Sequence, residues 1–180
     1  EVTGTVFRQT GAIPGITRAL VLDLTDEAAI RAALREAEPD VIVNCAAVAE
    51  PAACLADPAG SAALNVRLPE LLARHGARLI HLSSEQVFDG TKRIPYTVND
   101  TPRPLNLYGE QKLAGEQAML GAAPARSVVV RLPLLTGDSA NRRRSLHDTG
   151  RLCERLDKAD LPFRRPPIMP RTQRDRLELG

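Results

Sequence analysis

Two side chains capable of acid–base chemistry, Tyr108 and Lys112, lie four residues apart in this 180-residue sequence. On a helix, residues i and i+4 share a face, so the phenol and the ammonium group can point into one site. A cation beside a phenol lowers the phenol pKa from about 10, which favours proton exchange with a carbonyl or an alcohol near neutral pH. Taken alone, the spacing favours a solvated pair on a helix surface; Tyr96, the only other tyrosine, has Asp100 at this spacing.

A pair of serines supplies the hydroxyl group that a carbonyl-reducing site needs. Ser83 and Ser84 follow the apolar run 78–82, which is expected to be a buried strand, and Ser84 lies 24 residues before Tyr108. In an open parallel sheet, ligands bind at the carboxyl ends of the strands, so the Ser84 hydroxyl can reach a substrate oxygen. A serine, a tyrosine and a lysine on adjacent elements of such a sheet predict a site for carbonyl reduction.

The elements that must position these side chains alternate between apolar runs and amphipathic stretches. Asp26, for example, can cap a helix in which Ile30 and Leu34 share one face. Buried strands separated by such helices are typical of a parallel sheet covered on both faces, so we expect an α/β, doubly wound, Rossmann-like fold. The expected strands are 2–7, 19–24, 41–47, 78–82 and 127–132, and the expected helices are 26–38, 59–75 and 108–120.

Four segments resemble motifs of the extended short-chain dehydrogenase/reductase family. Within that family they are similar to the dTDP-4-dehydrorhamnose reductases and to the related regulatory β subunit of methionine adenosyltransferase. The segments are Pro39–Ala47, Leu82–Gly90, Pro104–Glu116 and Arg131–Pro133. The resemblance covers about residues 1–137, and the stretch from Leu82 to Glu116 is the most specific part.

The resemblance implies roles for the residues introduced above. Tyr108 would be the proton donor, Lys112 would lower the pKa of Tyr108 and hold the nicotinamide ribose, and Ser84 would bind the keto oxygen. The implied contacts to an NADP(H) cofactor are Phe7, Arg8, Gln9, Asp23, Leu24, Cys45, Ala46, Ala47 and Leu135, besides Tyr108 and Lys112. Arg8 can pair with a 2′-phosphate and no acid stands there to accept a ribose hydroxyl, which favours NADPH over NADH. A solvated loop arginine is the alternative.

The glycine-rich turn that would bind the cofactor pyrophosphate is not found. The segment 10–15 contains glycines, but only eleven residues separate Gly11 from Asp23, too few for a helix and a strand. Pro14 also stands where helix N–H groups should face a phosphate. We therefore expect a loop at 10–18 and no first strand, glycine turn or first helix in this chain. Residues 1–137 would be an incomplete NADP-binding Rossmann domain, and 138–180 a truncated portion of the substrate-binding lobe.

The implied activity is the NADPH-dependent reduction of a 4-keto nucleotide sugar, as in dTDP-rhamnose biosynthesis. Pro51–Leu55 and Ser83–Gln86 lack the acid pair and the aromatic residue that dehydrorhamnose reductases usually have at these places. The segments Cys45–Ala47 and Arg131–Leu135 are more similar to those of the adenosyltransferase β subunit. A non-catalytic, NADP-binding regulatory subunit is therefore the alternative. A homodimer and a partner enzyme both stay open.

Composition excludes several other classes of protein. The chain is 43% hydrophobic and 26% charged, and no apolar run approaches the 18 residues of a membrane-spanning helix. The net charge of +2 gives no general attraction to nucleic acid, so the basic run at 142–144 is expected to be a solvated surface. Contact of this run with a nucleotide-sugar pyrophosphate is the alternative. Three cysteines in no framework spacing indicate a reducing, cytoplasmic location. The cysteines and histidines have no metal-ligand spacing, and core packing is expected of His81.

Overall fold

The computed structural model describes residues 1–8, 13 and 15–133, and residues 1–133 form one compact unit. Its strands are β1 (Thr3–Val6), β2 (Arg18–Val21), β3 (Val41–Asn44), β4 (Arg78–Ser84) and β5 (Ser127–Leu132). Its helices are α1 (Glu27–Ala37), α2 (Pro51–Ala56), α3 (Pro58–Ala62), the π-helical turn η1 (Ala63–Arg67), α4 (Leu68–Arg74), the 3₁₀ turn η2 (Glu85–Val87) and α5 (Leu107–Ala122). The expected order of strands and helices is thus confirmed within these residues, and α2 is an addition.

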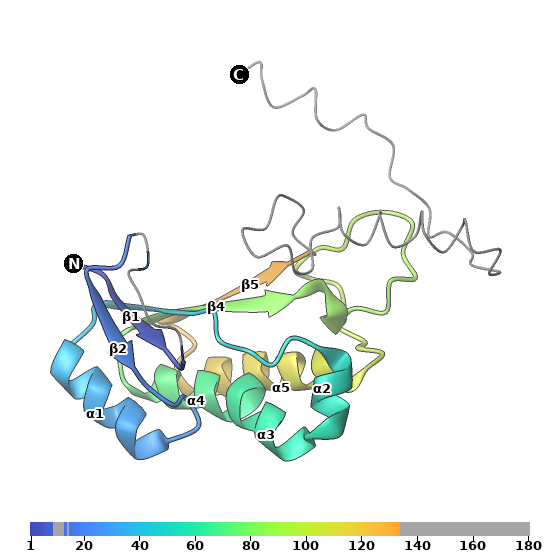
Figure 1. Ribbon diagram of the computed structural model, residues 1–180. Coiled ribbons are helices and arrows are strands. Elements are labelled where there is room, and N and C mark those ends of the chain that lie inside the picture. The colour runs from blue at the N-terminus through green and yellow to red at the C-terminus, as the bar shows by residue number, and fades with distance from the viewer. Residues whose placement is uncertain (9–12, 14, 134–180) are drawn as a thin grey trace. The chain divides into compact units, whose positions relative to one another are not determined.

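Every strand pair in the described part of the chain is parallel. β1 pairs with β2, and β3, β4 and β5 form a second sheet with β4 in the middle (Figure 1). The segment between β1 and β2 is too short for a crossover helix, in keeping with the loop expected there. The α/β fold with parallel strands is confirmed.

The helices cover one face of the three-stranded sheet. Seven buried residues of α1, α4, β4 and α5 and the residue after α5 form the core: Ile30, Leu68, Leu72, Ala73, Leu79, Met119 and Ala123. On the opposite face, Val43 and Val128, which flank Ile80 of β4 in register, are 57% and 51% exposed. Cover on both faces was expected and is wrong for the described residues, because the helices run along one side (Figure 1).

Local capping explains where α1 and α5 begin. The Asp26 carboxylate accepts a hydrogen bond from the backbone N–H of Ala29 (3.0 Å), as expected for the cap of α1. The Asn106 side chain accepts one from Gly109 (2.9 Å) and starts α5 immediately before Tyr108. The stretch expected to be one helix at 59–75 is instead α3, the π turn and α4 in succession.

Two glycines let α5 approach its neighbours closely. A side-chain carbon on Gly109 would clash with the carbonyl oxygen of Gln86, so the first turn of α5 lies directly against η2. A side-chain carbon on Gly115 would clash with the carbonyl oxygen of Asn65 in η1. These contacts hold the start of α5 next to the carboxyl end of β4.

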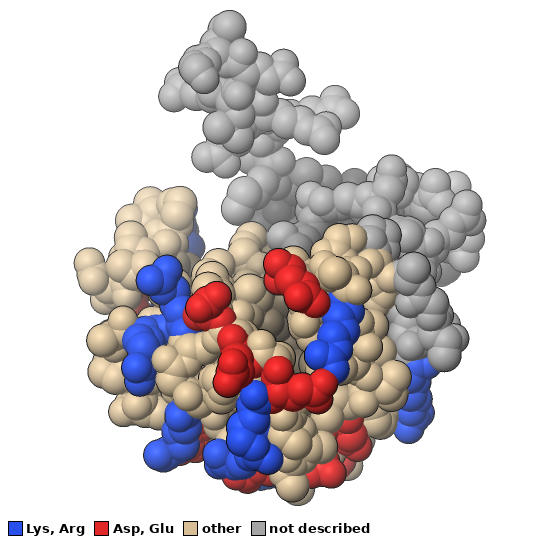
Figure 2. Space-filling model, turned by 90° about the vertical axis from the view of Figure 1, so that its left-hand side faces the viewer, with Lys and Arg blue, Asp and Glu red and all other residues tan. Residues whose placement is uncertain are grey.

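Charges of both signs lie close together on the surface. Figure 2 shows acidic side chains around a hollow with basic side chains beside them, on the side of the molecule that lies to the left in Figure 1. No helix in the ranges 1–8 and 15–133 is long and apolar enough to cross a bilayer.

Candidate active site

Ser84 and Tyr108 meet where β4 ends and α5 begins. Ser84 is the last residue of β4, Tyr108 lies in the first turn of α5, and both are at least nine-tenths buried. The Ser84 hydroxyl lies near enough to Tyr108 to act on the pKa of the phenol. The Ser84 hydroxyl also accepts a bond from the backbone N–H of Gln86 (3.2 Å) and lies 3.2 Å from Glu85 Oε2. The two hydroxyls that the sequence singled out therefore share one site.

The pKa of Tyr108 is raised, opposite to the expected direction. Burial is the largest cause, and the charge of Glu85 adds to it, whereas the hydrogen bond to Ser84 acts in the lowering direction. Lys112 does not contribute to this shift. The expectation that Lys112 lowers the Tyr108 pKa is wrong for this structure, and the phenol is protonated at neutral pH.

Lys112 shares the helix face of Tyr108, but its ammonium nitrogen contacts β4. The side chain is almost fully buried, and Nζ lies 2.7 Å from the carbonyl oxygen of Leu82 and 3.1 Å from Nε2 of His81. Burial lowers the pKa of Lys112 to about 8, while the charge of Glu116 acts in the opposite direction. The lysine is thus close to the site but bonded to the strand behind it.

His81 links the lysine to the neighbouring strand. Its ring is fully buried, and Nδ1 lies 3.1 Å from Nδ2 of Asn44, the last residue of β3. Burial, followed by the nearby charge of Lys112, lowers the pKa of His81 to about 4. Burial of His81 in the core was expected, but its polar contacts were missed. No local sequence pattern could have found them, because Asn44 and Lys112 lie 37 and 31 positions away along the chain.

A buried ion pair lies one helical turn beyond Lys112. Glu116 is buried and accepts hydrogen bonds from Arg131 Nη2 of β5 (2.6 Å) and from the Ser83 hydroxyl of β4. Hydrogen bonding to Glu116 raises the pKa of Arg131, whose guanidinium also lies over the ring of Phe88 at 5.0 Å. Sequence reasoning missed this pair, which ties α5 to both strands beside the site.

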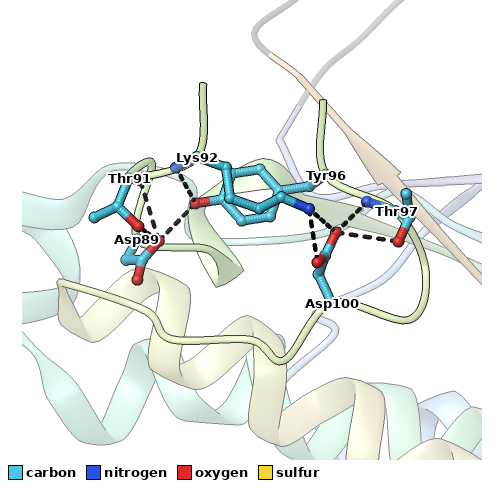
Figure 3. A network of polar contacts seen from close by, with 6 residues as sticks. All are labelled: Asp89, Thr91, Lys92, Tyr96, Thr97 and Asp100. Atoms are coloured by element: carbon cyan, nitrogen blue, oxygen red, sulfur yellow. Dashed lines mark hydrogen bonds and ion pairs between the residues drawn. The ribbon is translucent and has the colours of Figure 1, made fainter. Parts of the chain in front are cut away.

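The loop after Phe88 is held by a network of its own (Figure 3). Tyr96 stacks on Phe88 with ring centres 4.3 Å apart, and its hydroxyl donates to Asp89 at 2.6 Å. Lys92 binds both carboxylate oxygens of Asp100 at 2.7 Å and lies over the Tyr96 ring. The bond to Lys92, together with Thr97, lowers the pKa of Asp100 to about 2. Tyr96 is therefore a residue that anchors this loop.

The expected cofactor contacts lie at the ends of three strands. Arg8 stacks over the ring of Phe7 at 4.7 Å just after β1, and both are exposed. Asp23 follows β2, and its carboxylate accepts two bonds from Thr25 that lower its pKa, with a smaller effect of Arg8.

The remaining expected contacts differ in exposure. Cys45 is exposed and Ala46 and Ala47 are half-buried after β3, whereas Leu24 packs against the core. Gln9 and Leu135 lie outside the described residues. The structure thus brings Ser84 and Tyr108 together, with Lys112 one helical turn away and bonded to β4. The other expected contacts that are described lie at the carboxyl ends of β1, β2 and β3.

Residues 4–152 match the family model described as the RmlD substrate binding domain. The chain belongs to this family. Methionine adenosyltransferase 2 subunit beta of Xenopus tropicalis is 44% identical over 125 residues, which cover 65% of this chain and 36% of that protein. The dTDP-4-keto-6-deoxy-D-glucose reductase of Streptomyces niveus is 36% identical over 154 residues, 81% of this chain and 52% of that protein.

Among solved structures, the RmlD-family chain is similar to the dTDP-4-dehydrorhamnose reductase of Bacillus anthracis in complex with NADP. The TM-score is 0.66 at 25% identity, covering 76% of this chain and 50% of that one. The resemblance and the Rossmann-like fold expected from the motifs are confirmed. The chain spans about a third to a half of the length of the curated relatives it matches.

A second polar cluster in this RmlD-family chain fixes the position of α5. The Asn65 side chain binds both the N–H and the carbonyl of Val48 (3.0 and 3.1 Å) and donates to Gln111 at 2.9 Å. Gln111 in turn donates to the hydroxyl of Ser61 at 2.9 Å. Gln111 precedes Lys112, so the cluster orients the helix face that carries the candidate site.

Within the described residues, no three histidine, cysteine or acidic side chains are placed to hold a metal ion.

Proposed function

We propose that the protein containing this chain uses NADPH to reduce the keto group of a nucleotide sugar. The observation that carries the proposal is the pair of buried side chains of Ser84 and Tyr108 at the carboxyl end of β4, with Lys112 one turn further along α5. The printed activity of the Streptomyces relative, a dTDP-4-keto-6-deoxy-D-glucose reductase, supports this substrate class. Such a reaction would belong to dTDP-rhamnose biosynthesis.

The residues of this chain fit two parts of an NADP cofactor. Arg8 is exposed after β1, and its guanidinium has the donors that a 2′-phosphate requires. Lys112 of α5, whose ammonium nitrogen contacts Leu82 near the carboxyl end of β4, is the residue that would hold the nicotinamide ribose. The NADP complex of the Bacillus reductase supports this choice of cofactor. The described residues between β1 and β2 form no helix N-terminus for the pyrophosphate.

In the proposed reaction, Tyr108 acts as a general acid. NADPH, when bound, would supply the hydride for the keto carbon. Tyr108 would give its phenolic proton to the keto oxygen, so that an alcohol forms. The raised pKa keeps the phenol protonated before this step. The Ser84 hydroxyl would hold the keto oxygen, and its hydrogen bond would then stabilise the phenolate that remains on Tyr108.

The variant Tyr108→Phe tests the proposal, because it removes the acidic proton and keeps the ring. We expect turnover of dTDP-4-keto-6-deoxyglucose, measured as NADPH consumption, to fall by about a hundredfold or more. NADPH affinity, measured by calorimetry, should stay close to that of the wild type. The matched control is Tyr96→Phe, which loses only a loop hydrogen bond to Asp89 and should keep most of the turnover. Unchanged turnover in Tyr108→Phe would contradict the proposal.

A non-catalytic regulatory subunit is the second candidate. It is supported by the 44% identity to methionine adenosyltransferase 2 subunit beta and by Lys112, whose ammonium nitrogen contacts β4 instead of the phenol. This candidate predicts no NADPH consumption with any keto-sugar nucleotide and co-purification with a synthetase. We also propose a cytoplasmic location, which the unpaired thiols of Cys45 and Cys54 support.

A further inference from the structure

A row of hydrogen bonds links Asn44 of β3 to His81 of β4 and His81 to Lys112 of α5. Which atom donates in each bond follows from the bond that Asn44 makes with the backbone. The backbone N–H of Ala46 donates to Oδ1 of Asn44 at 3.1 Å. This bond turns the amide nitrogen of Asn44 toward Nδ1 of His81, 3.1 Å away. An amide nitrogen carries hydrogens and accepts no hydrogen bond, so Nδ1 must be the acceptor.

The direction of the row determines what His81 presents to Lys112. A neutral imidazole that accepts at Nδ1 carries its only proton on Nε2. That nitrogen lies 3.1 Å from Nζ of Lys112, which also donates to the Leu82 carbonyl at 2.7 Å. An ammonium group has three donors and no acceptor, whereas a neutral amine has a lone pair for Nε2–H and still has hydrogens for the carbonyl.

We propose that Asn44 and His81 are positioning residues that control the protonation of Lys112: the intact row holds a neutral amine, and charging Lys112 breaks the contact with His81. The row itself is inferred from hydrogen-bond geometry alone, whereas its role in catalysis rests on the proposed function. In that reaction, above about pH 8, the site would start from a neutral phenol and a neutral amine. As Tyr108 becomes a phenolate, the new negative charge favours uptake of a proton from solvent by Lys112.

The surroundings of Lys112 act on its pKa in opposite directions. Burial lowers the pKa of Lys112, and Glu116 on the same helix raises it. Both carboxylate oxygens of Glu116 are already bound by Arg131 of β5, and Ser83 of β4 binds one of them. Glu85 of η2 and Cys54 of α2 act on Tyr108, where both raise the pKa. His81 of β4 is held neutral by burial.

The first test reads the tautomer of His81 in the wild-type full chain by ¹⁵N NMR, in which protonated and unprotonated ring nitrogens differ in chemical shift. The chain has only three histidines, His75, His81 and His147, and His81→Gln assigns the signal. We expect a proton on Nε2 and a bare Nδ1 from about pH 6 to about pH 9. A proton on Nδ1, or a charged ring at neutral pH, would overturn the proposal.

The second test reverses the row with an isosteric change. In Asn44→Asp the carboxylate still accepts from Ala46 N–H, but it also accepts from Nδ1–H of His81, so Nε2 becomes an acceptor for an ammonium group. We expect the Lys112 pKa to rise by at least about one unit, a tenfold change in proton affinity. The measurement is the NMR titration of Nζ, which is simple to assign because the chain has only Lys92, Lys112 and Lys158.

The variant His81→Phe, which lacks the imidazole, separates an effect carried through the row of hydrogen bonds from the direct electrostatic effect of the added charge. In His81→Phe, the change Asn44→Asp should move the Lys112 pKa much less, because no ring connects the two residues. If Asn44→Asp shifts the Lys112 pKa equally in the wild type and in His81→Phe, the proposal is refuted. If Asn44→Asp does not fold, the wild-type tautomer decides alone. Neither readout involves turnover, so failure here and failure of the proposed reductase activity are distinguishable.

Discussion

His81 is a buried base whose neutral form is the one compatible with the folded chain. Burial and the neighbouring Lys112 lower its pKa from 6.5 to about 4. Between these two values the unfolded chain binds a proton that the folded chain does not bind. Folding stability therefore increases with pH across this interval and falls as the pH is lowered through it.

The variant His81→Gln should remove this pH dependence. For the wild type we expect His81 to contribute a loss of about 1.4 kcal/mol of unfolding free energy per pH unit as the pH falls from 6.5 toward 4. Urea unfolding at a series of pH values, compared between the two proteins, measures this contribution. Parallel curves for wild type and variant would show that His81 is protonated in the folded state as readily as in the unfolded one.

The residues that sequence reasoning found and missed differ in how far apart they lie along the chain. Tyr108 and Lys112 share a helix face, which the i and i+4 rule predicts. The contacts of Lys112 with His81 and of His81 with Asn44 join residues 31 and 37 positions apart, and no local pattern encodes them. The expected direction of the Tyr108 pKa shift was also wrong, because burial of the phenol, its largest cause, depends on tertiary packing.

At the scale of elements, the position of α5 depends on close backbone contact. Gly115 lies against the carbonyl oxygen of Asn65 in the π turn, whereas Gly121, in the last turns of the same helix, has no atom within 4 Å of an added carbon. The alternation of apolar runs and amphipathic stretches predicted the elements themselves, since burial on one face needs such a pattern. It could not predict α2, whose segment shows no clear helical face.

Alanine at the two glycines should therefore have opposite effects. Gly115→Ala should destabilise the chain by about 1–3 kcal/mol, because the backbone of η1 must move. Gly121→Ala should stabilise it by up to about 1 kcal/mol, because alanine is the better helix former and the position is open. Denaturant unfolding of the two variants measures both effects. A stabilising Gly115→Ala would mean that α5 and η1 do not lie in close contact.

At the scale of the whole molecule, the uncovered face of the three-stranded sheet is the main departure from the expected fold. Apolar strands alone predicted helices on both faces, but within the described residues the crossover connections that carry helices all lie on one side (Figure 1). The exposed Val43 and Val128 follow directly from this arrangement. Which face a helix covers is a property of connection topology, and residue periodicity does not report it.

The central place of β4 also has a consequence for the order in which the molecule opens. β4 is hydrogen-bonded on both sides, to β3 and to β5, whereas within the described part each of these two strands is paired on one side only. In native-state hydrogen exchange, the amides of β4 should be the slowest and should report global unfolding, while those of β3 exchange through smaller fluctuations. The strand that carries His81, Ser83 and Ser84 would then be the last to open. Faster exchange in β4 than in β3 would contradict this order.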